Sequence, residues 1–103
     1  MEKEEMLENL KNDVNETIAL YESFISGSAI ATRNMIDRIG EIATLEKLVQ
    51  STEGQPGFKK LYEHKQLHKS FEALVLKYKD LFSEKAYTFA DYRLKQPEVF
   101  LNK

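Results

Sequence analysis

The chain has 103 residues, 42% of them hydrophobic and 31% charged, so it carries enough apolar side chains for one core and is not a disordered chain. It contains no Cys, which excludes disulfides, thiolate metal sites and cysteine nucleophiles and suits a reducing compartment. No apolar run approaches the roughly 20 residues that span a membrane, and the acidic start does not resemble a signal peptide. We therefore expect a cytoplasmic protein with no membrane partner.

The pattern of apolar residues indicates helices. Glycine and proline are scarce, at 4 and 2 residues, and β-branched residues do not alternate with polar ones. Apolar residues instead recur at three- and four-residue steps, which is the period of an amphipathic helix. The sequence therefore predicts an all-α fold, and its length predicts one domain over residues 1–103.

The small net charge of −2 hides an asymmetry between the two halves of the chain. Residues 1–57 carry 11 acidic and 5 basic side chains, whereas residues 58–103 carry 6 acidic and 10 basic ones. The favoured interpretation is that an acidic helix packs against a basic one, within or between chains. A nucleic-acid surface on the second half is the less favoured alternative, because the acidic half beside it would repel phosphate.

The first half of the chain predicts two helices, over residues 3–26 and 29–50. Between them lies Gly27, flanked by two serines, which either ends the first helix or only bends it. The sequence leaves open whether the two helices are separate or continuous. One face of the first helix collects apolar residues, namely Leu7, Leu10, Val14, Ile18, Tyr21 and Ile25.

The second half begins with a clear loop at residues 51–57, which contains two glycines and a proline. The following apolar periodicity predicts helices over residues 58–83 and 86–96. Whether they are continuous is left open. The apolar phase holds through Phe89 and Tyr92, whereas the capping-box-like pattern that begins at Thr88 is compatible with a break near residues 84–88. Pro97 ends the last helix, and residues 97–103 are expected to dock as an apolar tail.

Folding the chain about the loop at residues 51–57 brings the two helical arms into register. Small residues then face large ones, with Gly27 and Ser28 opposite Phe82 and Leu81. This register predicts a long antiparallel helical hairpin that forms or joins a helical bundle. If both arms break, at Gly27 and near Ser83, the same hairpin folds in half into a four-helix bundle.

A second apolar face on the expected helix over residues 58–83 and its continuation favours self-association. Tyr62, Leu76 and Tyr87 belong to this face, which points away from the main apolar stripe. In so short a chain, such a face more often meets another subunit than a ligand. We therefore expect a dimer or larger species, assembled through these three residues.

His64 and His68 are the two histidines, and they lie four residues apart on one helical face. This spacing can hold a divalent ion, and the hairpin register places Glu46 opposite His64 as a third ligand. The favoured interpretation is a partly buried imidazole that is hydrogen-bonded to that carboxylate, so no metal site is predicted. Tyr92 and Arg93, like the two histidines, are further candidates for binding a small polar ligand.

The sequence shows no phosphate loop, nucleophile elbow or carboxylate dyad. We therefore expect a non-enzymatic oligomeric helical protein without a cofactor that binds another macromolecule, as an adaptor, assembly factor or inhibitor. The first alternative is a helical bundle that binds a small ligand or metal at a subunit boundary. The second is nucleic-acid binding through the basic half.

Overall fold

The computed structural model describes residues 2–102, and within this range it contains helices and no strand, which confirms the all-α fold. Met1 and Lys103, the two ends of the predicted domain, lie outside the described residues. The elements are α1 (Lys3–Ser23), α2 (Ile30–Val49), η1 (Thr52–Gly54), α3 (Gln55–Glu63), η2 (Leu67–Lys69), α4 (Phe71–Lys77), η3 (Lys79–Leu81), α5 (Glu84–Lys95) and α6 (Pro97–Leu101), where η marks a 3-10 helix.

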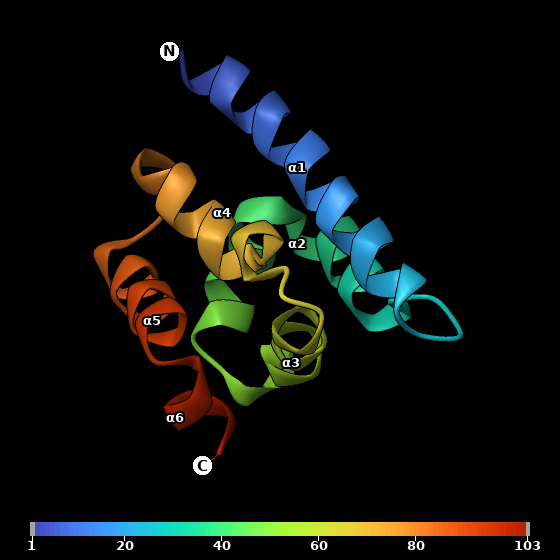
Figure 1. Ribbon diagram of the computed structural model, residues 1–103. Coiled ribbons are helices and arrows are strands. Elements are labelled where there is room, and N and C mark those ends of the chain that lie inside the picture. The colour runs from blue at the N-terminus through green and yellow to red at the C-terminus, as the bar shows by residue number, and fades with distance from the viewer. Residues whose placement is uncertain (1, 103) are drawn as a thin grey trace.

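The helices pack around one core. Figure 1 shows α1 along one side of the molecule and α5 and α6 on the opposite side, with α2, α3 and α4 between them. The principal extents are 37 × 29 × 22 Å. Side chains from α1, α2, α4 and α5 meet at the centre, and those buried most completely are Leu10, Val14, Ile18, Leu45, Val49, Val75, Ala86 and Ala90.

The first two helices are separate. α1 ends at Ser23, and residues 24–29 form a loop before α2 begins at Ile30. Gly27 lies exposed in this loop, and its φ is not in the left-handed region, so it does not end α1 as a left-handed cap.

The glycine that redirects the backbone is Gly40, inside the segment that the sequence predicts as one regular helix. Its φ of 85° and ψ of 168° lie in a region that side-chain-bearing residues rarely adopt. α2 is therefore two helical segments, residues 30–39 and 41–49, joined by a sharp kink. Met35 is the buried residue of the first segment, whereas the second buries Thr44, Leu45, Leu48 and Val49.

The single helix expected over residues 58–83 is divided in the structure into α3, η2, α4 and η3. The first break follows α3, where Lys65 adopts a positive φ of 59°. The N–H of Gln66 then donates to the carbonyl of Leu61 at 2.7 Å, and the N–H of Lys65 donates to that of Tyr62 at 3.1 Å. This pair of bonds is a Schellman motif, which satisfies the last carbonyls of a helix without any glycine.

Serine residues start the helices that follow each break. The Oγ of Ser70 accepts from the N–H of Ala73 at 3.1 Å at the start of α4, and the Oγ of Ser83 accepts from the N–H of Ala86 at 3.1 Å at the start of α5. The break suggested near Ser83 is therefore present. α5 runs on through the range expected for the last helix, residues 86–96, as far as Lys95.

The tail docks as a short helix. Phe100 of α6 is buried, and its ring packs edge to face against that of Phe58 in α3, with centroids 5.4 Å apart.

Ion pairs connect the acidic first half of the chain to its basic second half. The ammonium group of Lys77 lies 2.9 Å from the carboxylate of Asp13, and that of Lys69 lies 3.8 Å from the carboxylate of Glu16. These contacts agree with the favoured interpretation of the charge asymmetry, in which an acidic helix packs against a basic one.

Candidate functional site

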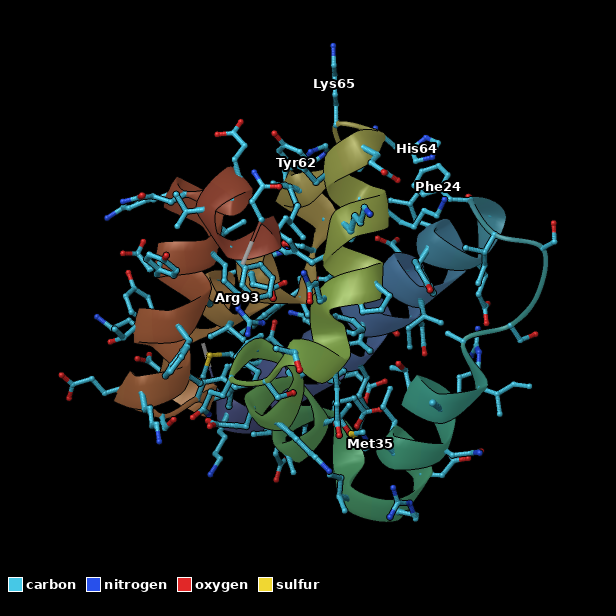
Figure 2. All side chains as sticks on the ribbon, turned by 90° about the horizontal axis from the view of Figure 1, so that it is seen from below. Phe24, Met35, Tyr62, His64, Lys65 and Arg93 are labelled. Carbon is cyan, nitrogen blue, oxygen red and sulfur yellow. The ribbon has the colours of Figure 1, made fainter. Side chains whose placement is uncertain are left out.

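The structure does not bring His64 together with Glu46. Glu46 instead accepts hydrogen bonds from the N–H and the Oγ of Ser83, at 2.6 and 2.8 Å. The His64 ring stacks on that of Phe24, with centroids 3.8 Å apart and planes 3° from parallel. Figure 2 shows these two rings side by side where the loop after α1 meets the end of α3. His68 is exposed in η2, and among the described residues no group of three or more His, Asp or Glu could hold a metal ion.

The residues expected to mediate self-association make contacts within the chain. The hydroxyl of Tyr62 donates to Glu98 Oε1 at 2.7 Å, which connects α3 to α6. The ammonium group of Lys79 lies 5.1 Å from the centroid of the Tyr87 ring, and Leu76 packs, partly buried, against the core. The second apolar face of the expected long helix is thus largely used inside the molecule, because that helix is broken into pieces.

Arg93, proposed above as a ligand-binding residue, lies in the interior. Its side chain is 3% exposed and forms an ion pair with Glu72, whose Oε2 lies 3.1 Å from Nη1. The guanidinium also donates to the carbonyl of Leu48 at 3.0 Å and to that of Ser51 at 2.9 Å, so it caps the C-terminal end of α2. Its carbon Cζ lies 4.0 Å from the centroid of the Phe100 ring. Tyr92, its neighbour, is partly buried on α5.

A pocket of about 280 Å³ opens beside this ion pair. Its walls come from α1, the loop at residues 24–29, α3 and α4, and both ends of α2 contribute. Apolar side chains supply most of the wall, among them Ile18, Leu61 and Phe71. A mostly apolar hollow with a few polar groups is typical of a binding site.

The kink at Gly40 explains how both ends of one helix reach the same pocket. Ile30 at the start of α2 and Leu48 near its end both line it. In a straight α-helix these residues would lie about 27 Å apart, since each residue adds 1.5 Å. Because the backbone turns sharply at Gly40, α2 folds back and encloses the pocket from two sides.

Two buried polar residues also line the pocket, Thr17 from α1 and Glu72 from α4, and each is 4% exposed. The hydroxyl of Thr17 donates to the carbonyl of Lys69 at 2.6 Å. Burial raises the pKa of the Glu72 carboxyl, and the nearby Arg93 guanidinium opposes that shift. The polar side chains of these two lining residues are therefore held in place by bonds to other elements.

Glu22 holds the wall of the pocket that is formed by the loop at residues 24–29 and the start of α2. Its Oε2 accepts the N–H of Ala29 at 2.7 Å, directly before α2, and Arg33 reaches both carboxylate oxygens, at 2.7 and 3.0 Å. The bonds from Arg33 and from the Ala29 N–H lower the pKa of Glu22 to about 2. This carboxylate fixes the loop and the start of α2 against α1.

No family model, curated protein or solved structure matches this chain. Of the described helices, none has the length and apolar character that crossing a membrane requires.

The Glu72–Arg93 pair was missed as a unit in reasoning from the sequence, although the sequence does carry a signal for it. Arg93 follows Ala86 and Ala90 at helical spacing, and Glu72 lies three residues before Val75. All of these residues are buried. Opposite charges on the apolar faces of two successive helices predict a buried ion pair once those helices are known to be separate.

Proposed function

We propose that this chain is a non-enzymatic binding protein that takes an apolar side chain of a partner protein into the pocket between α1, α2, α3 and α4. The observation that carries the proposal is the pocket itself, which combines mostly apolar walls with the buried polar residues Thr17 and Glu72. An adaptor, an assembly factor or an inhibitor would each use such a site.

An exposed apolar side chain of the pocket wall supports a protein partner over a free small molecule. Ile30 lines the pocket and is still 63% exposed. A small molecule inside the pocket would leave most of this side chain in water. A partner segment that inserts one anchor side chain would also cover its surroundings, which is the usual anatomy of a protein interface.

The charged groups of the pocket support recognition rather than acid–base chemistry. Glu72 is bound to Arg93, and Glu53 at the pocket wall lies 3.9 Å from the ammonium group of Lys47. Carboxylates held in ion pairs orient and balance charge, whereas a general base needs access to a proton on its substrate.

A substitution that fills the pocket tests this proposal. Gly57 lines the pocket on α3, its φ is not positive, and a Cβ placed there meets nothing within 4 Å. Gly57→Leu should therefore fold and block entry, with a gain in helix propensity. Gly27→Leu is the matched control, because Gly27 has the same free space and does not line the pocket.

The measurement is selection of a displayed library of short peptides on the unmodified protein, followed by binding to both variants. We expect the selected peptides to share one bulky apolar residue, to lose binding to Gly57→Leu, and to keep binding to Gly27→Leu. Peptides that bind both variants equally would show that the pocket is not the site. A selection without enrichment would also count against the proposal.

Self-association through Tyr62, Leu76 and Tyr87 stays a prediction. The intrachain contacts of Tyr62 and Tyr87 leave less of that face available than a continuous helix would. Light scattering at micromolar concentration measures it directly, and a mass of 12.0 kDa would identify a monomer.

A further inference from the structure

The pocket has an inner wall that water hardly reaches and an outer wall that is exposed. Ile18 of α1 and Leu61 of α3 line the pocket and are only 2% and 3% exposed. Ile30, at the start of α2, also lines it and is 63% exposed. The loop at residues 24–29 leads directly into this exposed side and contributes three lining residues. A side chain from a partner would reach the inner wall most easily if this loop moved outward.

The middle of the loop at residues 24–29 is not packed against the body of the protein. Residues 26–28 are exposed, and a Cβ placed on Gly27 would meet nothing within 4 Å. The end of the loop is bound to α1, since the N–H of Ala29 donates to Glu22. Segments with few buried contacts open locally at the lowest free-energy cost. The loop is therefore the part of the wall that is best suited to move.

A ring stack attaches the start of this loop to α3. Phe24 is the C-cap residue of α1 and His64 that of α3, and their rings lie parallel with centroids 3.8 Å apart (Figure 2). Each residue follows a lining residue of its own helix by three positions, Tyr21 in α1 and Leu61 in α3. Residues three apart share a helix face, so the stack joins the two helices about one turn beyond the pocket.

From these observations we propose that the loop at residues 24–29 is a lid on the pocket and that the Phe24–His64 stack is its latch. While the rings are stacked, the loop closes the side of the pocket between the ends of α1 and α3. When the rings part, the loop moves outward and Leu61 on the inner wall becomes accessible. This inference rests on the proposed function, because it describes how the same pocket admits its occupant.

The test is the rate at which a thiol on the inner wall is labelled. The chain contains no Cys, so Leu61→Cys places a single thiol there. Iodoacetamide alkylates this thiol only when the inner wall is exposed, and mass spectrometry measures the rate. Val75→Cys is the matched reporter for unfolding of the whole protein, because Val75 is fully buried in the core and does not line the pocket.

Low concentrations of urea separate local opening from global unfolding. A lid that opens exposes little surface, so the labelling rate of Leu61→Cys should barely change with urea, whereas that of Val75→Cys should rise steeply. We expect Leu61→Cys to react faster than Val75→Cys and more slowly than a thiol in an unfolded chain. If Leu61→Cys does not fold, Ile18→Cys replaces it, since Ile18 is also a buried residue of the inner wall.

Variants of the two rings test the latch. His64→Ala should raise the labelling rate of Leu61→Cys about two- to twelvefold, the factor that corresponds to the loss of one aromatic pair. Phe24→Ala should do the same, and the double variant should be no faster than either single one, because both remove one contact. His64→Phe keeps a stacked ring and should retain the slow rate. His68→Ala is the control, since His68 is exposed in η2, and it should leave the rate unchanged.

The same urea dependence at Leu61→Cys and Val75→Cys would overturn the lid, as would a Leu61→Cys rate equal to that of an unfolded chain. Equal rates in His64→Ala and His68→Ala would overturn the latch. These failures are distinct from failure of the proposed function, because labelling requires no partner. Peptides that lose binding to Gly57→Leu, together with an unchanged labelling rate in His64→Ala, would support the pocket as the binding site and reject the latch.

Discussion

The two ends of α2 are held by the same kind of side-chain pair in opposite environments. At the start, Glu22 accepts the N–H of Ala29 and pairs with Arg33. At the end, Arg93 donates to the carbonyls of Leu48 and Ser51 and pairs with Glu72. An acid at the N-terminus and a base at the C-terminus both complement the helix dipole and satisfy terminal backbone groups.

The environments differ strongly. The side chains of Arg33 and Glu22 are 46% and 17% exposed, whereas those of Arg93 and Glu72 are 3% and 5% exposed. An exposed ion pair contributes little, and salt screens it further. Breaking a buried pair leaves an uncompensated charge in the interior, which destabilises the fold strongly.

This contrast teaches which wall of the pocket is fixed. The end of α2 is anchored by a buried network and by core residues such as Leu45 and Val49. The start of α2 carries the exposed residue Ile30 and depends on a solvent-accessible pair, with a glycine kink behind it. We expect the segment at residues 30–39 to adapt when a partner enters, while the end of α2 stays in place.

The largest effect is expected at the buried end. Arg93→Ala removes the hydrogen bonds to the carbonyls of Leu48 in α2 and of Ser51 just after it, and leaves Glu72 buried without its cation. It should therefore lower the free energy of unfolding by about 3–5 kcal/mol. Chemical denaturation measures this. The double variant Glu72→Leu/Arg93→Met should lose less, because no charge is stranded. If Arg93→Ala were as stable as the unmodified protein, Arg93 would not be what holds the end of α2 in place.

The second-largest effect on stability is expected at the kink of α2 at Gly40. Gly40→Ala has free space for its methyl group, but φ is +85°, so the strain alone should cost about 1–3 kcal/mol. The same variant should weaken binding in the pocket, since the kink brings Ile30 and Leu48 to one site. Gly27→Ala is the control: its φ is not positive and its Cβ also meets nothing, so its melting temperature should stay the same or rise. Equal melting temperatures for the two variants would argue against the kink.

A smaller effect is expected at Gly54, where η1 passes close to the end of α2. A Cβ on this residue would lie 2.8 Å from the carbonyl oxygen of Leu48, one of the two that Arg93 caps. Because backbone must move, Gly54→Ala should destabilise by about 1–2 kcal/mol, typical of mild overpacking. Thermal unfolding beside Gly57→Ala, which has free space, measures the difference. A neutral Gly54→Ala would show that the contact relaxes freely.

The sequence was sufficient for the class of fold and for several element ends. Helical periodicity predicted the all-α fold. The loop expected at residues 51–57 does separate α2 from α3, but α3 already begins at Gln55 and residues 52–54 form η1. A break near Ser83 was left open on the capping-box-like pattern that begins at Thr88. The structure has the break, but Ser83 is the cap and Thr88 lies inside α5. These features depend on neighbouring residues, which is why they can be read from a single chain.

The features that form the site depend on residues far apart in sequence. Nothing local marks Gly40 rather than Gly27 as the position with positive φ, since each lies in a segment where a helix is plausible. The end of α3 at Lys65 has no glycine to indicate a left-handed cap. The pairing of Glu72 with Arg93 requires that α4 and α5 be separate helices, which a continuous apolar stripe from residue 58 onward conceals.

The smallest effect is expected at the exposed end, and its dependence on pH separates the two pairs. The folded pKa of Glu22 is about 2, below its ordinary value of 4.5, so its contribution to stability is present above about pH 4.5 and is lost as pH falls through about 2. Glu22→Gln should therefore destabilise slightly at neutral pH and have no effect at the acidic end of that range. Burial raises the pKa of Glu72, so protonation there favours the folded state as pH falls, which is the opposite sign. NMR titration of the side-chain carboxyl carbons measures the pKa of both groups. A Glu22 titration midpoint near pH 4.5 would show that its bonds to Ala29 and Arg33 do not form in solution.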